Sequence, residues 1–340
     1  MRNNALYFPF ISVPNTAWTI RTLLYWDKLS SIVPLEYNYR RRELAPFMRE
    51  LLSADLVTAV SPAAHLYRLG DFESAFIQLL EDRLKRQRLS QVPLVRTRVD
   101  IHIEKLAGIA EFLVERGLAA RNGASWYSVD TPVANLFMTY LAVCLGNLDD
   151  VDAEPVTNLW EYAQWFGHGT ASRRGKAPQH QQARHQILTC LLPIPDERVT
   201  LSELVDFKEK HGSLLPALRI KIESQSAVIA NLPDPEDRAD ATLAFINDCQ
   251  LQVDELRDAM RFSWKRLVFG ALAPLSGTGM QWASTPPDTV MAFSGGAVSF
   301  AGAVYAAFSS IGGLSDVQKK QPLAYIAHAR GRLSRNDRSK

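Results

Sequence analysis

The sequence predicts an α+β, predominantly helical protein, with a small N-terminal α/β unit followed by a helical C-terminal domain. Strand-like and helix-like segments alternate before residue 62, β-patterned runs are lacking after about residue 190, and a long amphipathic helix follows Pro235. The chain has 340 residues, 47% hydrophobic and 22% charged, which suffices for two domains or one large domain with a real core. The formal net charge of +2 is too small to indicate nucleic-acid binding by itself.

The N-terminal unit begins with an apolar strand over residues 5–11. A helix capped by Asn15 or Thr16 follows, and a second strand covers residues 31–35. A basic-start helix interrupted by Pro46 leads to a third strand over residues 56–60. This β-α-β-α-β order within about 60 residues favours a parallel sheet.

The next segments are two amphipathic helices, a hairpin and a buried helix. The helices are expected over residues 72–88 and 105–116, and Gly117 ends the second one. The hairpin covers residues 117–129 with Asn122-Gly123 in its turn. The helix after Thr131-Pro132 is apolar nearly all round, so we expect it to be buried.

The domain organisation is predicted from a change in composition. We expect an N-terminal domain over residues 1–167, a basic linker or loop over 168–185, a helical domain over 186–330 and a flexible tail over 331–340. Within the helical domain, Thr200 and Glu203 form a capping box. Asp234 caps the long helix from Pro235 to Val268, whose apolar stripe is Ile246, Cys249, Val253, Leu256, Met260, Trp264 and Leu267.

The predicted linker is also a candidate binding site for a polyanion. It carries basic side chains and no acid, and the candidates are Arg173, Arg174, Lys176 and Arg184. The alternative interpretation is a solvated loop, because the segment lacks the interleaved aromatic residues that favour single-strand binding. The same two interpretations apply to the basic clusters at residues 40–42 and 83–88.

The most unusual segment runs from Leu267 to Ser315, where Asp288 is the single charged residue and 8 of the 18 glycines are found. One interpretation is a Gly/Ala-rich hairpin buried in the helical domain, with residues 289–314 packed on the long helix. Small residues would allow close approach and bulky ones would fill the contact: Gly295, Ser299, Phe300, Ala303, Val304, Ala307 and Phe308. The other interpretation is membrane contact through residues 289–314, a stretch long enough to span a bilayer.

Familiar catalytic and metal-binding motifs are missing. The chain contains no HExxH, no GxSxG and no glycine-rich loop ending in GK[ST]. Its three cysteines, Cys144, Cys190 and Cys249, form no CxxC pair and suit a reducing cytoplasm. The sequence therefore predicts neither a metal site nor a cofactor. It also predicts a cytoplasmic protein, which under the membrane interpretation would be peripheral to the membrane.

Three strings together resemble a family of uncharacterised bacterial proteins. They are ALYFPFI, LLYWDKLSSIVP and LPIPDERVTLSELVDFKEKHGSLLPALR, and the C-terminal PLAYIAHARGRLS is similar to the ending of that family. The family signature is an LYxP strand followed by LLYWDxxxxIVP. The resemblance implies a cytoplasmic bacterial protein of accessory gene content, for which antiphage defence is a frequent role. It implies no catalytic residue.

Two functional hypotheses follow. The first is a non-enzymatic defence component that binds or senses a phage-derived structure or a protein partner, using the apolar hairpin for partner or membrane contact. The second is an enzyme acting on nucleic acid or nucleotides, with its site at the carboxyl edge of the N-terminal sheet. Carboxylates converging near Asp27, Glu36 and Glu43 would support the enzyme. The lack of a recognisable catalytic set favours the first hypothesis.

Overall fold

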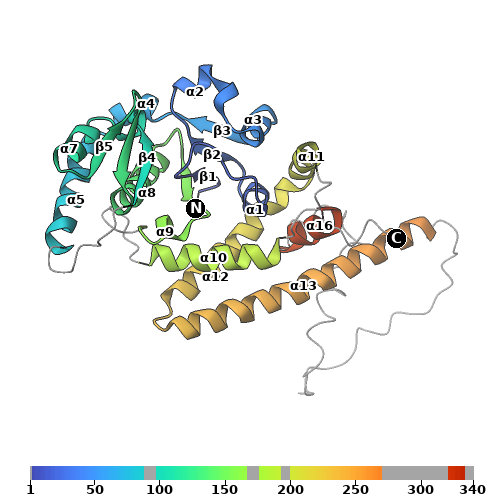
Figure 1. Cartoon of the computed structure of the whole chain (residues 1–340). Helices are drawn as coiled ribbons and strands as arrows, with labels where there is room; N and C mark the ends of the chain where they lie inside the picture. Colours follow the sequence, from blue (N-terminus) through green and yellow to red (C-terminus); the bar gives the residue numbers. More distant parts are fainter. Residues whose placement is uncertain (1, 88–96, 167–175, 193–199, 270–320, 334–340) are drawn as a thin grey trace.

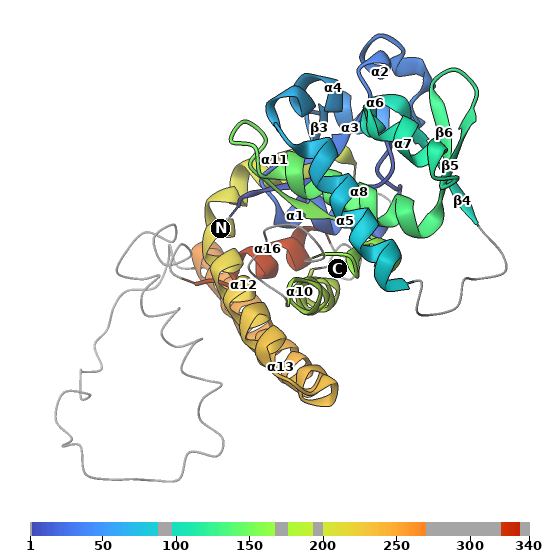
Figure 2. The same ribbon diagram turned by 90° about the vertical axis from the view of Figure 1, so that its left-hand side faces the viewer.

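The computed structural model describes residues 2–87, 97–166, 176–192, 200–269 and 321–333. It confirms an α+β, predominantly helical fold, in which an N-terminal part with two small sheets lies beside a group of long helices (Figure 1). Both views place the helices of residues 177–269 on the same side of the N-terminal part (Figures 1 and 2).

The first sheet is parallel, as the alternation of strands and helices predicts. Its order is β3-β2-β1-β7, and its strands are β1 Asn4–Tyr7, β2 Leu29–Ile32, β3 Val57–Val60 and β7 Ala153–Val156. The first strand is shorter than expected because the chain leaves the sheet before Pro9, which has no N–H to donate to a ladder. The fourth strand, β7, was not predicted.

Alternate residues of β1 serve two different cores. Ala5 and Tyr7 belong to a core shared with the C-terminal helices, whereas Leu6 and Phe8 belong to a core under the second sheet. Helices therefore cover both faces of the parallel sheet, as such sheets require. The short helices of this part are α1 Ala17–Tyr25, α2 Glu36–Tyr39, η1 Arg41–Glu43, α3 Pro46–Ser53, α4 Pro62–His65, η2 Leu66–Arg68 and α9 Trp160–Ala163.

The second sheet is antiparallel and has the order β4-β6-β5. Its elements follow the chain as α5 Phe72–Gln87, β4 Arg98–His102, α6 Ile103–Leu106, α7 Ile109–Glu115, β5 Ala119–Asn122, β6 Trp126–Asp130 and α8 Thr131–Gly146. This is the order of a helix–turn–helix followed by a two-stranded wing. The hairpin with Gly123 at a φ of 80° and the buried α8 are as predicted. The single helix expected over 105–116 is wrong, because Ala107 has a φ of 48° and breaks it.

The remaining helices are α10 Ala177–Leu191, α11 Leu201–His211, η3 Gly212–Leu214, α12 Leu215–Asn231, α13 Pro235–Phe269 and α16 Ala324–Leu333. The capping box at Thr200 is confirmed, with its hydroxyl accepting from the Glu203 amide at 3.2 Å. The start of the long helix is also confirmed, since Asp234 accepts from the Glu236 amide at 2.7 Å. In the apolar stripe of this long helix, Ile246, Cys249 and Val253 are buried. The stripe residues after Val253 have side chains outside the described ones.

The predicted linker is wrong over residues 177–185, which form most of α10. Its glutamines, alanine and arginine are good helix formers, and Pro178 lies in the first turn, where proline is tolerated. The expected start of this helix at residue 186 is therefore too late. Residues 331–333 of the predicted tail likewise belong to α16.

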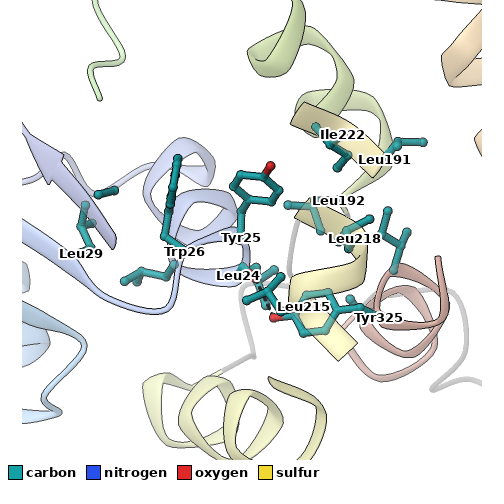
Figure 3. Close-up of a cluster of buried hydrophobic side chains, with 14 of the residues drawn as sticks. Leu24, Tyr25, Trp26, Leu29, Leu191, Leu192, Leu215, Leu218, Ile222 and Tyr325 are labelled. Carbon is teal, nitrogen blue, oxygen red and sulfur yellow. Dashed lines mark hydrogen bonds between the residues drawn. The ribbon is translucent and has the colours of Figure 1, made fainter. Parts of the chain in front are cut away.

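The C-terminal helices share one core with the N-terminal sheet. Figure 3 shows the end of α1 and the start of β2 facing the C-terminal helices, with side chains from Leu24, Tyr25, Trp26, Leu29, Leu191, Leu192, Leu215, Leu218, Ile222 and Tyr325. Tyr325 donates its hydroxyl proton to the Leu24 carbonyl at 2.6 Å. The apolar segment 289–314, with the contact predicted for it, lies outside the described residues. In the ranges that the structure describes, no helix is both long and apolar enough to cross a bilayer.

Candidate functional site

The basic residues predicted to bind a polyanion are not gathered on one described surface. Arg173 and Arg174 lie outside the described residues, and Lys176 donates to the Asn231 carbonyl at 2.9 Å. Arg184 is only 5% exposed and forms an ion pair with Glu223 at 3.2 Å. Polyanion binding and the alternative of a solvated loop both need an accessible Arg184, whereas α10 turns this side chain toward the core and Glu223.

Arg184 belongs to a buried polar cluster that joins α1, α10 and α12. The Glu223 carboxylate accepts from Tyr25 at 2.8 Å and pairs with both Arg184 and His180. Burial alone would raise the pKa of Glu223, but the neighbouring Arg184 and His180 lower it below its ordinary value. The carboxylate is thus charged and fully engaged, which is the behaviour of a structural group.

The three carboxylates proposed for an enzyme site do not converge. Asp27 precedes β2 and Glu36 follows it, so the two lie at opposite ends of that strand. Asp27 pairs with Arg219 at 2.6 Å, Glu36 with His102 at 2.9 Å, and Glu43 with Arg40 at 3.9 Å. Each carboxylate therefore has its own partner, and this version of the site is not formed.

A pocket of about 150 Å³ lies instead at the carboxyl edge of the parallel sheet. Its walls come from the loop after β1, from β4 and β6, and from helices, and include Pro9, Asp100, His102, Lys105, Trp126 and Tyr162. Strand β1 has β2 on one side and β7 on the other, so the order of the strands reverses here. Ligands of open α/β sheets bind outside the carboxyl ends of strands at this kind of reversal.

The Lys105 amine is the chemically distinctive group of this pocket. The residue is 3% exposed, and its Nζ donates to the Pro9 carbonyl at 3.0 Å. Burial lowers the pKa of Lys105 to about 7. Throughout the described ranges, no carboxylate lies within 4.0 Å of this nitrogen. A buried amine without a counter-charge is costly to keep, and such groups gather at functional sites.

His102 holds one wall of the pocket in place. Its Nδ1 accepts from the Glu104 amide at 3.3 Å, which assigns the proton to Nε2, 2.9 Å from the Glu36 carboxylate. Glu104 in turn accepts from the Leu35 amide at 2.7 Å. Because both ring nitrogens are occupied, His102 positions the loop before α2 and is not free to act as a base.

Asp100 adds a carboxylate to the lining and accepts from the Asn122 side-chain amide at 3.1 Å, and the other walls are aromatic or apolar. The Trp126 ring meets His102 edge to face, with centroids 5.1 Å apart, and Met138 completes this side. Burial raises the pKa of Tyr162 to about 12, so its hydroxyl stays protonated at neutral pH. Besides His102, the pocket therefore presents one amine, one carboxylate and an apolar surface to a small molecule. In the part of the chain that the structure describes, no three His, Cys, Asp or Glu side chains gather as metal ligands.

Sequence reasoning did not select Lys105. One signal was available, since Lys105, Ile109 and Leu113 are spaced by four residues along the predicted helix, and a lysine in line with an apolar stripe is unusual. The contact with Pro9 spans 96 residues, and no local pattern indicates it.

The strings that carry the family resemblance meet in space. Arg219, which ends the string from Leu192, donates to the Tyr25 carbonyl at 2.9 Å and to both carboxylate oxygens of Asp27. Lys208 of the same string donates to the carbonyls of Trp26 and Asp27 at 3.0 and 2.9 Å. The YWD residues thus serve as a docking point for the C-terminal helices.

Comparison with models of protein families, with curated proteins and with solved structures finds no match in any of the three. The resemblance to a bacterial family and the role in antiphage defence therefore stay predictions.

Proposed function

We propose that this protein binds a small organic carboxylate in the pocket at the carboxyl edge of its parallel sheet. The observation that carries the proposal is the buried Lys105 amine, which lacks a counter-charge among the described residues. A carboxylate entering the pocket would supply that charge, and its apolar part would pack against Trp126 and Met138. The proposal keeps the binding role of the first hypothesis and the sheet-edge location of the second.

Binding should depend on the protonation of Lys105. Its pKa lies at about 7, and a carboxylate interacts best with the ammonium form. Affinity should therefore be greatest below pH 7 and should fall by roughly ten-fold for each pH unit above it. A ligand held only by apolar contacts would show no such dependence.

Isothermal titration with propanoate tests the proposal. We expect Lys105→Met to weaken binding by about 2 kcal/mol, roughly thirty-fold, because a charge-assisted hydrogen bond is lost while the volume of the side chain is kept. Lys85→Met is the matched control, since Lys85 is 72% exposed and far from the pocket in sequence. Equal propanoate affinity in wild type and Lys105→Met would contradict the proposal.

A further inference from the structure

The chemistry of the pocket points to a narrower ligand class, an inference that rests on the proposed carboxylate site. We propose that the ligand is a small 2-oxo acid and that the Lys105 amine captures its carbonyl carbon as an imine. When the carboxylate of a 2-oxo acid pairs with this nitrogen, the carbonyl carbon, which is bonded to the carboxyl carbon, lies near the same nitrogen. Lysines in desolvated pockets are activated in this way for carbonyl substrates.

Lys105 has the geometry that this step requires. Its nitrogen is anchored by the Pro9 carbonyl, a neutral acceptor that orients the amine and does not hold its positive charge as a carboxylate would. Lys105 is among the residues that line the pocket although it is 3% exposed, so its side chain borders the space that a small ligand would fill. The pocket walls are mainly apolar or aromatic, which limits the water that would hydrolyse an imine.

Lys208 shows why a lowered pKa is not sufficient. Burial lowers the pKa of Lys208 to about 8, so this amine is also partly neutral near pH 7. Its nitrogen is held between two carbonyl oxygens, those of Trp26 and Asp27, and the residue is not part of the lining of the Lys105 pocket. Lys208 therefore serves as an internal control, a partly neutral amine that lies outside this pocket.

The reaction is balanced without an additional reagent. The neutral amine of Lys105 attacks the carbonyl carbon of the 2-oxo acid and gives a carbinolamine after proton transfer from nitrogen to oxygen. Departure of the hydroxyl group as water, with one proton taken from solvent, then forms the carbon–nitrogen double bond of a protonated imine, with no change of oxidation state. The protonated imine keeps a positive charge beside the ligand carboxylate. Capture should speed up as pH rises through 7, opposite to the affinity for a simple carboxylate.

The test is reductive trapping of the wild-type protein with pyruvate and cyanoborohydride at pH 7, followed by peptide mapping. Cyanoborohydride supplies the hydride that converts the imine to a stable secondary amine. We expect one carboxyethyl group on Lys105, exceeding that on Lys208 or Lys85 by roughly ten-fold or more. Propanoate, which has the carboxylate but no carbonyl, should reduce this labelling, and Lys105→Arg should abolish it.

The outcomes separate the two proposals. Propanoate binding without a pyruvate adduct on Lys105 overturns the imine and leaves the carboxylate site intact. An adduct on Lys105 without propanoate affinity supports imine capture and overturns simple carboxylate binding. Labelling spread over the lysines according to their exposure, or equal on Lys208 and Lys105, overturns the imine proposal. The trapping experiment needs no variant, so its result does not depend on how a substitution affects folding.

Discussion

Replacing Lys105 with methionine is expected to raise the free energy of unfolding at pH 7 by about 3 kcal/mol. Burial lowers the pKa of Lys105 from 10.5 to about 7, so the folded protein holds this proton less tightly than the unfolded chain does. At pH 7 that difference costs about 4 kcal/mol. Methionine removes this cost and fills a similar volume, while the lost hydrogen bond to the Pro9 carbonyl offsets about 1 kcal/mol.

The sign of the pH dependence follows from the lowered pKa. Above pH 10.5 the amine is neutral in both states, and its burial carries no charge penalty. As pH falls from 10.5 to 7, the unfolded chain gains a proton that the folded protein does not, so wild type loses stability relative to the variant. Below pH 7 both states are protonated and the difference is constant. The advantage of Lys105→Met should therefore be largest at pH 7 and below and vanish near pH 10, and above that pH the lost hydrogen bond should leave the variant less stable by up to about 1 kcal/mol.

Denaturant unfolding at pH 7 and at pH 10 would measure this effect in wild type and variant. Lys85→Met should change stability little at either pH, since the Lys85 side chain is 72% exposed. A destabilised Lys105→Met at pH 7 would show that the amine is structurally required. A stabilised variant that no longer binds propanoate would show that wild type gives up stability to keep a binding group.

The fold was predictable where the signal is local. The strand–helix alternation, the Thr200–Glu203 capping box and the start of α13 at Pro235 each depend on residues close together in sequence, and the structure has all three. Strands β4 and β7 have five and four residues, too few to show a clear period. The first half of helix α10 was hidden because its histidines and glutamines resemble loop composition, and the buried residues of the helix are confined to Ala183, Arg184, Ile187 and Leu191.

The site was not predictable, because distant segments form it. Pro9 and Lys105 come together only when the loop after β1 packs beside the turn from β4 into α6. The pattern of apolar residues in a single sequence indicates whether a segment is a helix or a strand. It does not indicate which distant loop that segment contacts. Asp27 shows the same limit: it was a candidate for a catalytic carboxylate cluster, whereas its partner Arg219 is 192 residues away.

That Asp27–Arg219 pair should be strongly coupled in a double-mutant cycle. Arg219 is 1% exposed and gives its guanidinium hydrogens to Tyr25, Asn3 and Asp27. Asp27→Ala leaves this buried cation without its anion, which should cost about 3 kcal/mol even though the Asp27 side chain is 46% exposed. Arg219→Met leaves the Tyr25 carbonyl without this donor and should cost about as much.

The double variant should lose less stability than the sum of the losses in the two single variants. Once the cation is gone, removing Asp27 orphans no further charge, so both changes together should cost about 4 kcal/mol, and the coupling should be about 2 kcal/mol. Chemical denaturation of the four proteins measures it. The Arg40–Glu43 pair is the control, because its side chains are 61% and 55% exposed and an exposed pair of this kind contributes less than about 0.5 kcal/mol. Additive costs at Asp27 and Arg219 would mean that water screens the pair as it screens a surface pair. Strong coupling would show that the YWD residues, which precede β2 at the amino edge of the sheet, hold the C-terminal helices in place. The proposed ligand pocket lies at the opposite, carboxyl edge.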